Sequence, residues 1–480
     1  MKTLKNISII LFLALGLWSC DSLLDVETKH ALPQEDMENE EGAKSLIIGV
    51  YDRMQEPTYA GRDFLTLPDV LGDNVKLNPG ATRYTRQYQF TPYYNIDIWD
   101  AAYQQIVSIN EALYYLDKLN ETPSVKALKG EALFLRAYDY FYLASIYGRM
   151  PGHLVNGFDL CVPLIKEPFF NNGGSITEQA SVPRDKVDVV WAQIVQDLND
   201  AFTYMNGNDN GNFPNRGSAI AAKALLSRVY LYMGKWAESA TAATYVLDNA
   251  PVKIYSGNQY TSVFSTGSES IWQLHYTEAE NLLSSSLHSA YGTKDDGYRD
   301  DEGYGNGKGT GDAVLSVTDE FVALLDPVND IRFGALRKVK YSGLKLWWTI
   351  KFNSWKKSDL FGLDDVPLIR ISEMLLNRAE AYAHQNNMTQ ARKDINEFRG
   401  KRGIGDASVP DSGLLDEILL QRRLEFAFEG HRYFDRKRLG LDILRPEGLP
   451  TVPYSDYRVV AAIGTTELDV NKKLVQNPGY

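Results

Sequence analysis

Hydrophobic positions recur at three- and four-residue steps over much of the chain, which is the period of an amphipathic α-helix. The clearest case is the segment 124–147, where one helical face collects Leu128, Ala132, Leu135, Tyr142 and Ile146. The same period predicts further helices at about 42–54, 99–119, 187–205, 219–233, 235–247, 367–384, 388–402 and 414–429. The pattern therefore predicts a mainly α-helical protein.

The helical period stops in two long regions that are rich in glycine, proline, asparagine and aromatic residues. The first covers residues 57–98 and the second 251–366, in which only 270–276 and 346–352 have the composition of strands. Loops of this length inside a compact domain are usually functional. We therefore predict a single domain over 41–480, with a loop-rich half that has a few short strands and a helical core at about 42–56, 99–148, 187–250 and 367–402.

Three of the predicted helices share a motif of two apolar residues, an arginine and a tyrosine. Its first copy ends in Arg136-x-x-x-Tyr140, and Arg228 and Arg378 hold the arginine position in the other two. In these two copies a second helix follows with a small residue facing back, Ala240 or Ala391. Such helix pairs are typical of tetratricopeptide repeats, whereas unrelated amphipathic helices are the alternative. Because a spacing of four places both side chains on one face, we predict that the arginines brace neighbouring helices.

The first 20 residues have the pattern of a lipoprotein export signal. Two lysines precede the apolar stretch 7–18, which is followed by Ser19 and Cys20. This stretch is shorter than the roughly 20 apolar residues that span a bilayer. We predict that residues 1–19 are removed, that Cys20 is acylated, and that 20–40 tether the body to a membrane surface. An ordinary cleaved signal or a buried helix is the alternative, because Trp18 is larger than the residue usual at its position.

Charge and cysteine content limit the partners and the covalent chemistry. The net charge of −12 argues against nucleic acid as a partner, because binding to phosphates needs concentrated lysine and arginine. If Cys20 carries the anchor, Cys161 has no cysteine partner, and we predict that it is a small buried hydrophobe.

The motifs of the common enzyme classes are missing from the sequence. There is no Gly-x-Ser-x-Gly elbow, no His-Glu-x-x-His zinc motif and no phosphate-binding loop. The acidic pairs 295–296, 300–301 and 364–365 do not by themselves indicate glycoside hydrolysis, which needs a defined separation of two carboxylates. We predict no catalytic residue, no metal site and no cofactor; a glycoside hydrolase, or Ca²⁺ bound at the first two pairs, stays open as an alternative.

Several segments together resemble one known family. They are Gly130-Glu-Ala-Leu-Phe-Leu-Arg-Ala-Tyr-Asp-Tyr-Phe141, Ala224 to Trp236, Arg378-Ala-Glu-Ala-Tyr-Ala383, Ala391 to Gly403, Gln421 to Arg432, and the terminal Gln476-Asn-Pro-Gly-Tyr480. In this order and spacing the chain resembles the SusD/RagB family of surface lipoproteins of Bacteroidetes. The resemblance implies a SusD-like fold, with tetratricopeptide-type helix pairs and an irregular half that faces the ligand.

The resemblance also implies a function. Members of the family are non-catalytic proteins of the outer membrane, lipid-anchored and exposed at the cell surface. They cap a SusC-like TonB-dependent transporter, and they deliver oligosaccharides, or in some cases peptides, to it. We therefore expect a glycan-binding protein, with peptide or other nutrient capture as one alternative and a lipid-anchored tetratricopeptide scaffold that binds only protein as another.

Aromatic and polar residues of the two irregular regions are the candidate ligand contacts. Aromatic rings stack on the apolar faces of sugars, while Arg, Asn and Asp bond to the hydroxyl groups. From this chemistry we predict ligand contacts at Asp73, Asn74, Arg83, Tyr84, Tyr88, Tyr298, Tyr304, Trp347 and Trp348. The alternative for each ring is that it fills core under a long loop, and we expect one of the two adjacent tryptophans to be buried.

Overall fold

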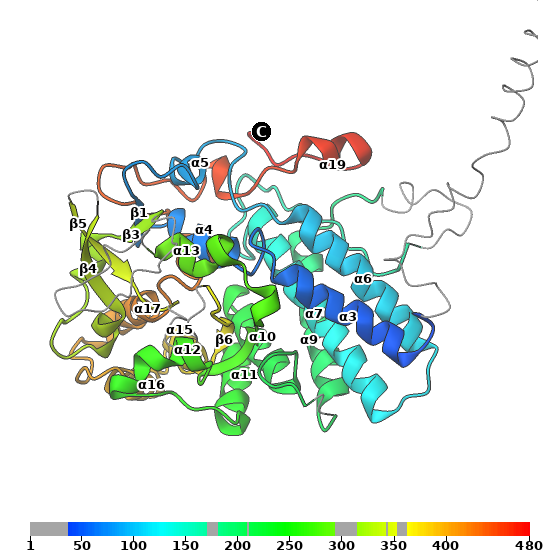
Figure 1. Cartoon of the computed structure of the whole chain (residues 1–480), viewed down its shortest axis with the longest axis horizontal. Coiled ribbons are helices and arrows are strands. Elements are labelled where there is room, and N and C mark those ends of the chain that lie inside the picture. Colours follow the sequence, from blue (N-terminus) through cyan, green and yellow to red (C-terminus); the bar gives the residue numbers. More distant parts are fainter. Residues whose placement is uncertain (1–36, 170–180, 209–210, 293–313, 342–343, 353–361) are drawn as a thin grey trace, which may run out of the picture.

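The computed structural model describes residues 37–169, 181–208, 211–292, 314–341, 344–352 and 362–480 (Figure 1). The predictions for the export signal, for Cys20 and for most of the tether lie outside the described residues. So do Tyr298 and Tyr304, together with the acidic pairs 295–296 and 300–301.

The helical part of the molecule is a succession of long helices, each packed against the next. It begins with α3 (Glu40–Met54), α6 (Trp99–Asp117), α7 (Pro123–Tyr147) and α9 (Val187–Met205), which lie on the right of Figure 1. It continues through two helix pairs and a last long helix, namely α10 (Ala219–Tyr232), α11 (Trp236–Asn249), α15 (Ile371–His384), α16 (Met388–Lys401) and α17 (Leu414–Glu425). The structure thus confirms the predicted mainly α-helical fold class, with helix pairs.

Local sequence explains where the longest helix begins and ends. The Thr122 side chain accepts a hydrogen bond from the Val125 amide at 3.1 Å, and Pro123 occupies the first turn, where its missing N–H costs nothing. Gly148, in an extended conformation, ends the helix. Nearly all of α7 is buried, so it forms the centre of the helical part.

The three repeated arginines each grip a carboxylate on another helix. Each makes two hydrogen bonds of 2.6–2.9 Å, in the pairs Arg136 with Asp197, Arg228 with Glu373, and Arg378 with Asp394. These pairs join α7 to α9, α10 to α15 and α15 to α16. The small residues Ala240 and Ala391 are buried, as expected for crossing points of helices. The prediction that the arginines brace neighbouring helices is confirmed.

The first irregular region contains more regular structure than its sequence indicates. It holds α4 (Asp63–Val70), β1 (Val75–Leu77) and α5 (Thr85–Tyr88). Every residue of α4 except Asp63 is buried. A helix that is surrounded by protein has no polar face, so it shows no amphipathic period, and for this reason the sequence did not reveal it.

The two irregular regions meet in one four-stranded sheet at the left of Figure 1. The strand β1 pairs with β3 (Leu315–Val317), which pairs with β5 (Leu344–Thr349), and β5 pairs with β4 (Leu336–Tyr341). All three pairings are antiparallel. Segments 57–98 and 251–366, which are far apart in the sequence, therefore contribute strands to one sheet.

The predicted start of the helix 367–384 is wrong, because the residues there form part of a second, two-stranded sheet. Residues 366–370 form β6 (Val366–Arg370), antiparallel to β2 (Ser270–Leu274), and the predicted helix 367–384 begins only at Ile371. Both strands are buried at every position, so neither shows the alternation that marks a half-exposed strand. The apolar residues 366–369 that precede Arg370 are equally compatible with the first turn of a buried helix.

Shorter elements connect these parts. They are α12 (Val263–Thr266), α13 (Leu287–Tyr291), α14 (Asp319–Val322), α18 (Arg432–Arg438) and α19 (Thr465–Val470), with short 3₁₀ turns at 257–262, 278–280, 283–285, 331–335, 411–413 and 457–459. Cys161 is buried, which confirms the expected small hydrophobe, and burial raises the pKa of its thiol to about 12.

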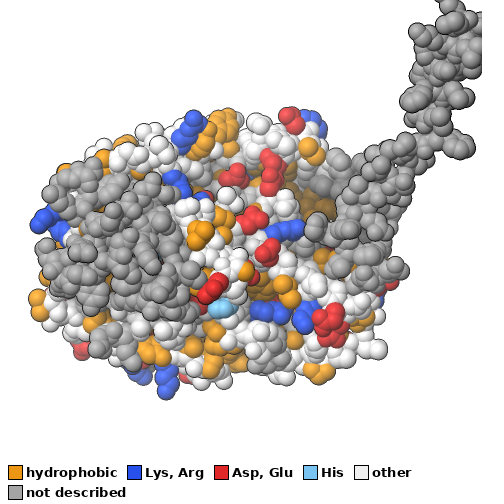
Figure 2. Space-filling model, viewed as in Figure 1, with side chains coloured by type: hydrophobic (Ala, Val, Ile, Leu, Met, Phe, Trp, Pro, Cys, Tyr) orange, Lys and Arg blue, Asp and Glu red, His pale blue; other side chains and the backbone are white. Residues whose placement is uncertain are grey.

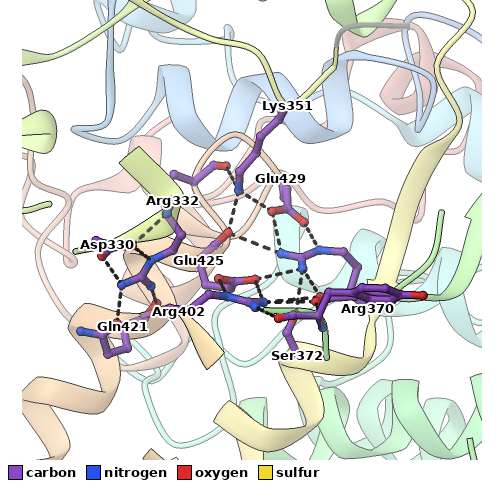
Figure 3. Close-up of polar contacts among 12 residues, drawn as sticks. Asp330, Arg332, Lys351, Arg370, Ser372, Arg402, Gln421, Glu425 and Glu429 are labelled. Atoms are coloured by element: carbon purple, nitrogen blue, oxygen red, sulfur yellow. Dashed lines mark hydrogen bonds and ion pairs between the residues drawn. The ribbon is translucent and has the colours of Figure 1, made fainter. Parts of the chain in front are cut away.

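A buried network of charged side chains lies between the sheets and the last helices (Figure 3). Arg370, at the end of β6, donates to Glu269 at 2.7 Å, to Glu425 at 2.9 Å, and to both carboxylate oxygens of Glu429. Arg402 donates two hydrogen bonds of 2.8 Å to Glu425. Lys351, just after β5, donates to Glu429 at 2.7 Å and to two backbone carbonyls.

This network balances three cations with three carboxylates. Burial alone would raise the pKa of Glu425, but Arg402 and Arg370 lower it well below its ordinary value, so the carboxylate stays charged. Charges that are taken out of water cost several kcal/mol each, and only well-placed partners offset that cost. The network therefore allows one arrangement of β5, β6 and α17 and penalises others.

The C-terminal segment is fastened to the end of α7. The last carbonyls of a helix have no partner within the helix, and they carry the negative end of its dipole. Here Lys437 donates to the carbonyls of Ser145 and Ile146, and Arg184 and Asn477 both donate to that of Tyr147. Arg184 also holds the Asn477 amide oxygen at 2.9 Å. Two buried basic side chains and one amide thereby cap the helix and fix residues near 477, although burial lowers the pKa of Lys437 well below its ordinary value.

We expect Arg228→Ala to lower the free energy of unfolding by about 3–5 kcal/mol, because it leaves the Glu373 carboxylate buried without its partner. Chemical denaturation followed by circular dichroism measures the change. Lys472→Ala is the control, since Lys472 and its partner Asp469 are both largely exposed, and it should cost less than about 1 kcal/mol. Equal losses in the two variants would contradict the bracing role.

We expect stability to fall as the pH drops from about 6.5 to about 4, because burial lowers the pKa of His431 to about 4. Between these pH values the unfolded chain binds a proton at His431, whereas the imidazole in the folded protein stays neutral. The charged groups that act electrostatically on the ring are Glu373, Asp435, Arg228 and Arg422. His431→Gln should remove roughly 3 kcal/mol of this pH dependence, measured by urea denaturation at several pH values. If the free energy of unfolding depends on pH equally in His431→Gln and in wild type, groups other than His431 cause the dependence.

Candidate functional site

Asp73 and Asn74, at the start of β1, are tied to the last helices. The Asp73 carboxylate accepts hydrogen bonds from Arg432 at 2.6 and 2.9 Å and lies 3.0 Å from Arg423. Burial opposes the ionised form, but the hydrogen bonds and charge of Arg432 still lower the pKa of Asp73. Asn74 is fully buried; it donates to Asp69 at 2.8 Å and accepts from Arg423 at 2.9 Å. In this structure both side chains hold β1 in place.

Tyr84 is also engaged inside the protein. Its side chain is 7% exposed, and its hydroxyl donates to Asp63 at 2.5 Å, while Asp63 is paired with Arg62. Burial raises the pKa of this hydroxyl, so the phenol stays protonated. Tyr84 has a positive φ of 66°, a conformation that costs energy for a non-glycine residue and that these contacts stabilise.

Arg83 and Tyr88 lie closer to solvent. Both are half-buried; Arg83 directly precedes Tyr84, and Tyr88 is the last residue of the short helix α5. The Arg445 guanidinium lies 5.4 Å from the centre of the Tyr88 ring and donates to the Val70 carbonyl. The ring is therefore held in place, and part of it remains accessible to a ligand.

The two adjacent tryptophans lie on opposite faces of β5, as neighbouring residues of a strand must. Trp348 is 1% exposed and packs with Val339 and Leu346 in a small apolar cluster. Trp347 is half-buried, with Phe333 edge-on to its ring and the Lys338 ammonium 5.0 Å from it. This confirms the expectation that one of the pair is buried.

The most exposed aromatic residues of the described part of the chain are on the loop after α5. Among the described residues, Tyr93 is 62% exposed and Tyr94 38%, which are high values for large rings. The Arg86 guanidinium lies 4.4 Å from the centre of the Tyr94 ring, and the Tyr480 ring lies 5.1 Å from that of Tyr93. These rings belong to the aromatic-rich first region but are not among the ligand contacts predicted from sequence. The segment Pro92-Tyr93-Tyr94 in a predicted loop is the sequence signal that could have identified them as exposed rings.

Other rings of the same region are core residues. Tyr59 is fully buried, and its hydroxyl donates to Asp139 at 2.5 Å, while Phe64 is 3% exposed. They pack against each other with ring centres 5.1 Å apart. Tyr59 and Phe64 therefore belong to the core of the loop-rich half, whereas Tyr93 and Tyr94 project from it.

The charged surface is mixed. On the face shown in Figure 2, described acidic and basic side chains are interspersed, and several acidic ones lie near the centre. Within the described residues, no group of three His, Cys, Asp or Glu side chains is arranged to hold a metal ion. Nor does any helix of the described part have the length and apolar character needed to cross a membrane.

Comparison with known proteins gives consistent matches across the chain. A family model described as starch-binding and associating with the outer membrane matches residues 22–231, and the SusD/RagB model, described as the SusD family, matches 340–444. A SusD-like protein P2 of Formosa agariphila is 24% identical over 530 residues and is aligned over the full length of both chains.

Solved structures show the same fold. A SusD superfamily protein of Bacteroides vulgatus has a TM-score of 0.80 at 24% identity, over 92% of this chain and 99% of its own. A putative sugar binding protein of the same organism has a TM-score of 0.78 at 23% identity, over 92% of this chain and 98% of its own. With the two family models and this shared fold, the chain belongs to the SusD/RagB family.

Proposed function

We propose that the protein is a non-catalytic glycan-binding protein of the cell surface that delivers oligosaccharides to a SusC-like TonB-dependent transporter in the outer membrane. The observation that carries this proposal is the pair of exposed rings at Tyr93 and Tyr94 on a well-anchored loop. The family description as starch-binding and the sugar binding neighbour of the same fold support it.

Exposed rings that are held in place suit the recognition of sugars. A ring that faces water stacks on the apolar face of a sugar, and it loses little conformational entropy if its neighbours already fix it. Tyr480 backs the Tyr93 ring, and Arg86 flanks the Tyr94 ring and offers N–H donors for hydroxyl groups. Such a surface binds without any catalytic group.

The residues predicted from sequence take two different parts in this proposal. Trp347, Arg83 and Tyr88 are accessible and remain proposed ligand contacts, as do Tyr298 and Tyr304. Asp73, Asn74, Tyr84 and Trp348 are buried and act by positioning the loops and strands that carry the contacts. Binding of peptides, or of the transporter alone, is the competing outcome.

The membrane attachment is a further part of the proposal. Acylation of Cys20 would place the folded body, which begins at α3, on a tether of about 20 residues. Several acyl chains on one cysteine anchor durably, since each buried methylene group adds about 0.8 kcal/mol. The transporter partner would then lie in the same membrane.

We expect the double variant Tyr93→Ala/Tyr94→Ala to bind the recognised glycan at least about tenfold more weakly, because stacking on both rings is lost. Affinity electrophoresis against a panel of soluble plant, host and microbial polysaccharides identifies the glycan. Calorimetry then measures the affinity, with tryptic peptides as a further probe.

Tyr114→Ala is the matched control for this experiment. Tyr114 is 37% exposed on α6, in the helical part, and a Lys118 ammonium lies 3.9 Å from its ring centre, so it has the same exposure and a similar cation contact as Tyr94. It should bind as wild type does. If wild type binds peptides or only the purified transporter, and no glycan, the proposed function is wrong.

We expect Cys20→Ala to be exported but to leave the membrane fraction, because the thiol that would carry the acyl chains is absent. Detergent phase partitioning and labelling with radioactive palmitate measure the change. Substitution of the buried Cys161 by Ala should leave the label in place. Retention of palmitate by the Cys20→Ala protein would contradict the anchor.

A further inference from the structure

A pocket of about 650 Å³ lies beside the C-terminus. Its walls are the turn 155–158, the segment 455–460 and the segment 477–479, with Arg149 between them. We call it the C-terminal pocket. Its volume falls within the roughly 300–1,000 Å³ that ligand pockets occupy. None of its lining residues is among the ligand contacts predicted from sequence.

The walls of the C-terminal pocket are fixed by buried side chains. Arg149 is 6% exposed and donates to the backbone carbonyls of Tyr454 at 2.5 Å and Asp456 at 2.9 Å. Asn477, which Arg184 holds, donates to the carbonyls of Tyr147 and Ala461 at 3.0 and 2.7 Å. A pocket that is formed before binding spends less free energy on ordering its own loops.

An aromatic ring forms one wall. Tyr457 lines the pocket, the Tyr480 ring lies 4.9 Å from it, and the Tyr93 ring lies 5.1 Å from Tyr480. The three rings are in contact one after another, edge-on or tilted, from the pocket to the exposed loop after α5. A row of neighbouring rings therefore connects Tyr93 with the C-terminal pocket.

Gly479 is what allows the Tyr457 ring to lie there. Its φ of +101° is in the region that favours glycine, and a Cβ atom at this position would lie 2.5 Å from Cγ of Tyr457. Real Cβ contacts are never that short, so any larger residue would displace the ring. The backbone of the C-terminus and the ring thus fit each other.

The chemistry of the lining suits an uncharged polar ligand. Its two charged side chains, Arg149 and Asp456, are opposite in sign, and both carboxylate oxygens of Asp456 accept hydrogen bonds from Arg458. The turn 155–158 presents the exposed Asn156 and the Gly157 backbone. An aromatic face together with amide and backbone groups is the combination that binds a sugar ring.

We propose that the C-terminal pocket is a subsite for an uncharged sugar residue, which stacks on Tyr457 while the rest of the glycan lies along Tyr480 and Tyr93. This inference rests on the proposed glycan binding and specifies the ligand class as a neutral glycan. Anionic polysaccharides would bring carboxylates or sulfates to a lining whose cationic side chain, Arg149, is only 6% exposed and already donates to backbone carbonyls.

The test compares variants of the full protein on neutral and anionic glycans. The neutral probes are starch, xylan, laminarin and galactomannan, and the anionic probes are alginate, polygalacturonate and heparin, each in affinity electrophoresis and calorimetry. Tyr457→Ala should weaken binding of the recognised neutral glycan about tenfold, while Tyr457→Phe, which keeps the ring, should stay within about threefold of wild type. Gly479→Ala should also weaken binding, because it moves the ring without removing it.

Tyr230→Ala is the matched control, since Tyr230 is a half-buried tyrosine that lines a different pocket of about 340 Å³ between helices of the helical part. It should bind as wild type does. A second measurement uses only the wild-type protein, so its result does not depend on whether a variant folds. In hydrogen exchange followed by mass spectrometry, the bound neutral glycan should slow exchange in the segments 155–158 and 455–460.

Four results would overturn the proposal, and they distinguish its failure from that of the proposed function. If wild type binds a neutral glycan but Tyr457→Ala binds it equally well, or if the glycan leaves exchange at 155–158 and 455–460 unchanged, the C-terminal pocket is not a subsite and the proposed function stands. If wild type binds only anionic glycans, the subsite is wrong while glycan binding stands. If it binds no glycan at all, both proposals fail.

Discussion

The buried network around Arg370 and Glu425 is the constraint on which the rest of the structure depends. It connects β6, the end of β5 and α17, which come from distant parts of the chain, and it balances three cations with three carboxylates away from water. A misplaced strand would leave one of these charges buried and unpaired, at a cost of several kcal/mol. The irregular half therefore has a defined position against the helical part, even though much of it is not regular secondary structure.

A fixed frame of this kind lets loops carry exposed rings without collapsing onto them. The ion pair of Asp73 with Arg432 holds the start of β1, and the Tyr84 hydroxyl on Asp63 holds the chain before α5. At the other end of the same loop, Tyr480 supports Tyr93, and the cap on α7 fixes the C-terminal segment that carries Tyr480. Binding residues on loops that a rigid scaffold positions are a common solution in proteins. Here the scaffold consists of buried ion pairs and a helix cap.

The long amphipathic helices could be predicted from sequence because each has one face in the core and one in water. The helix Val187–Met205 has the bounds that its period predicts, and the repeated arginines join neighbouring helices as their spacing indicates. The helix α4 and the strand β6 could not be predicted well because protein surrounds them on all sides. Without a polar face there is no periodic signal, and length and flanking residues alone do not distinguish helix from strand.

The sequence by itself determined the fold class, the family resemblance and the two regions that carry the aromatic residues. Only the tertiary structure decided which of these residues are exposed: Tyr84 and Trp348 are buried, whereas Tyr93 and Tyr94 project into solvent. The same ring fills a core or forms a binding surface, so composition cannot distinguish the two uses. The C-terminal pocket likewise exists only because residues near 150, 456 and 478 meet in space, held by hydrogen bonds to carbonyls that have no signature in the sequence.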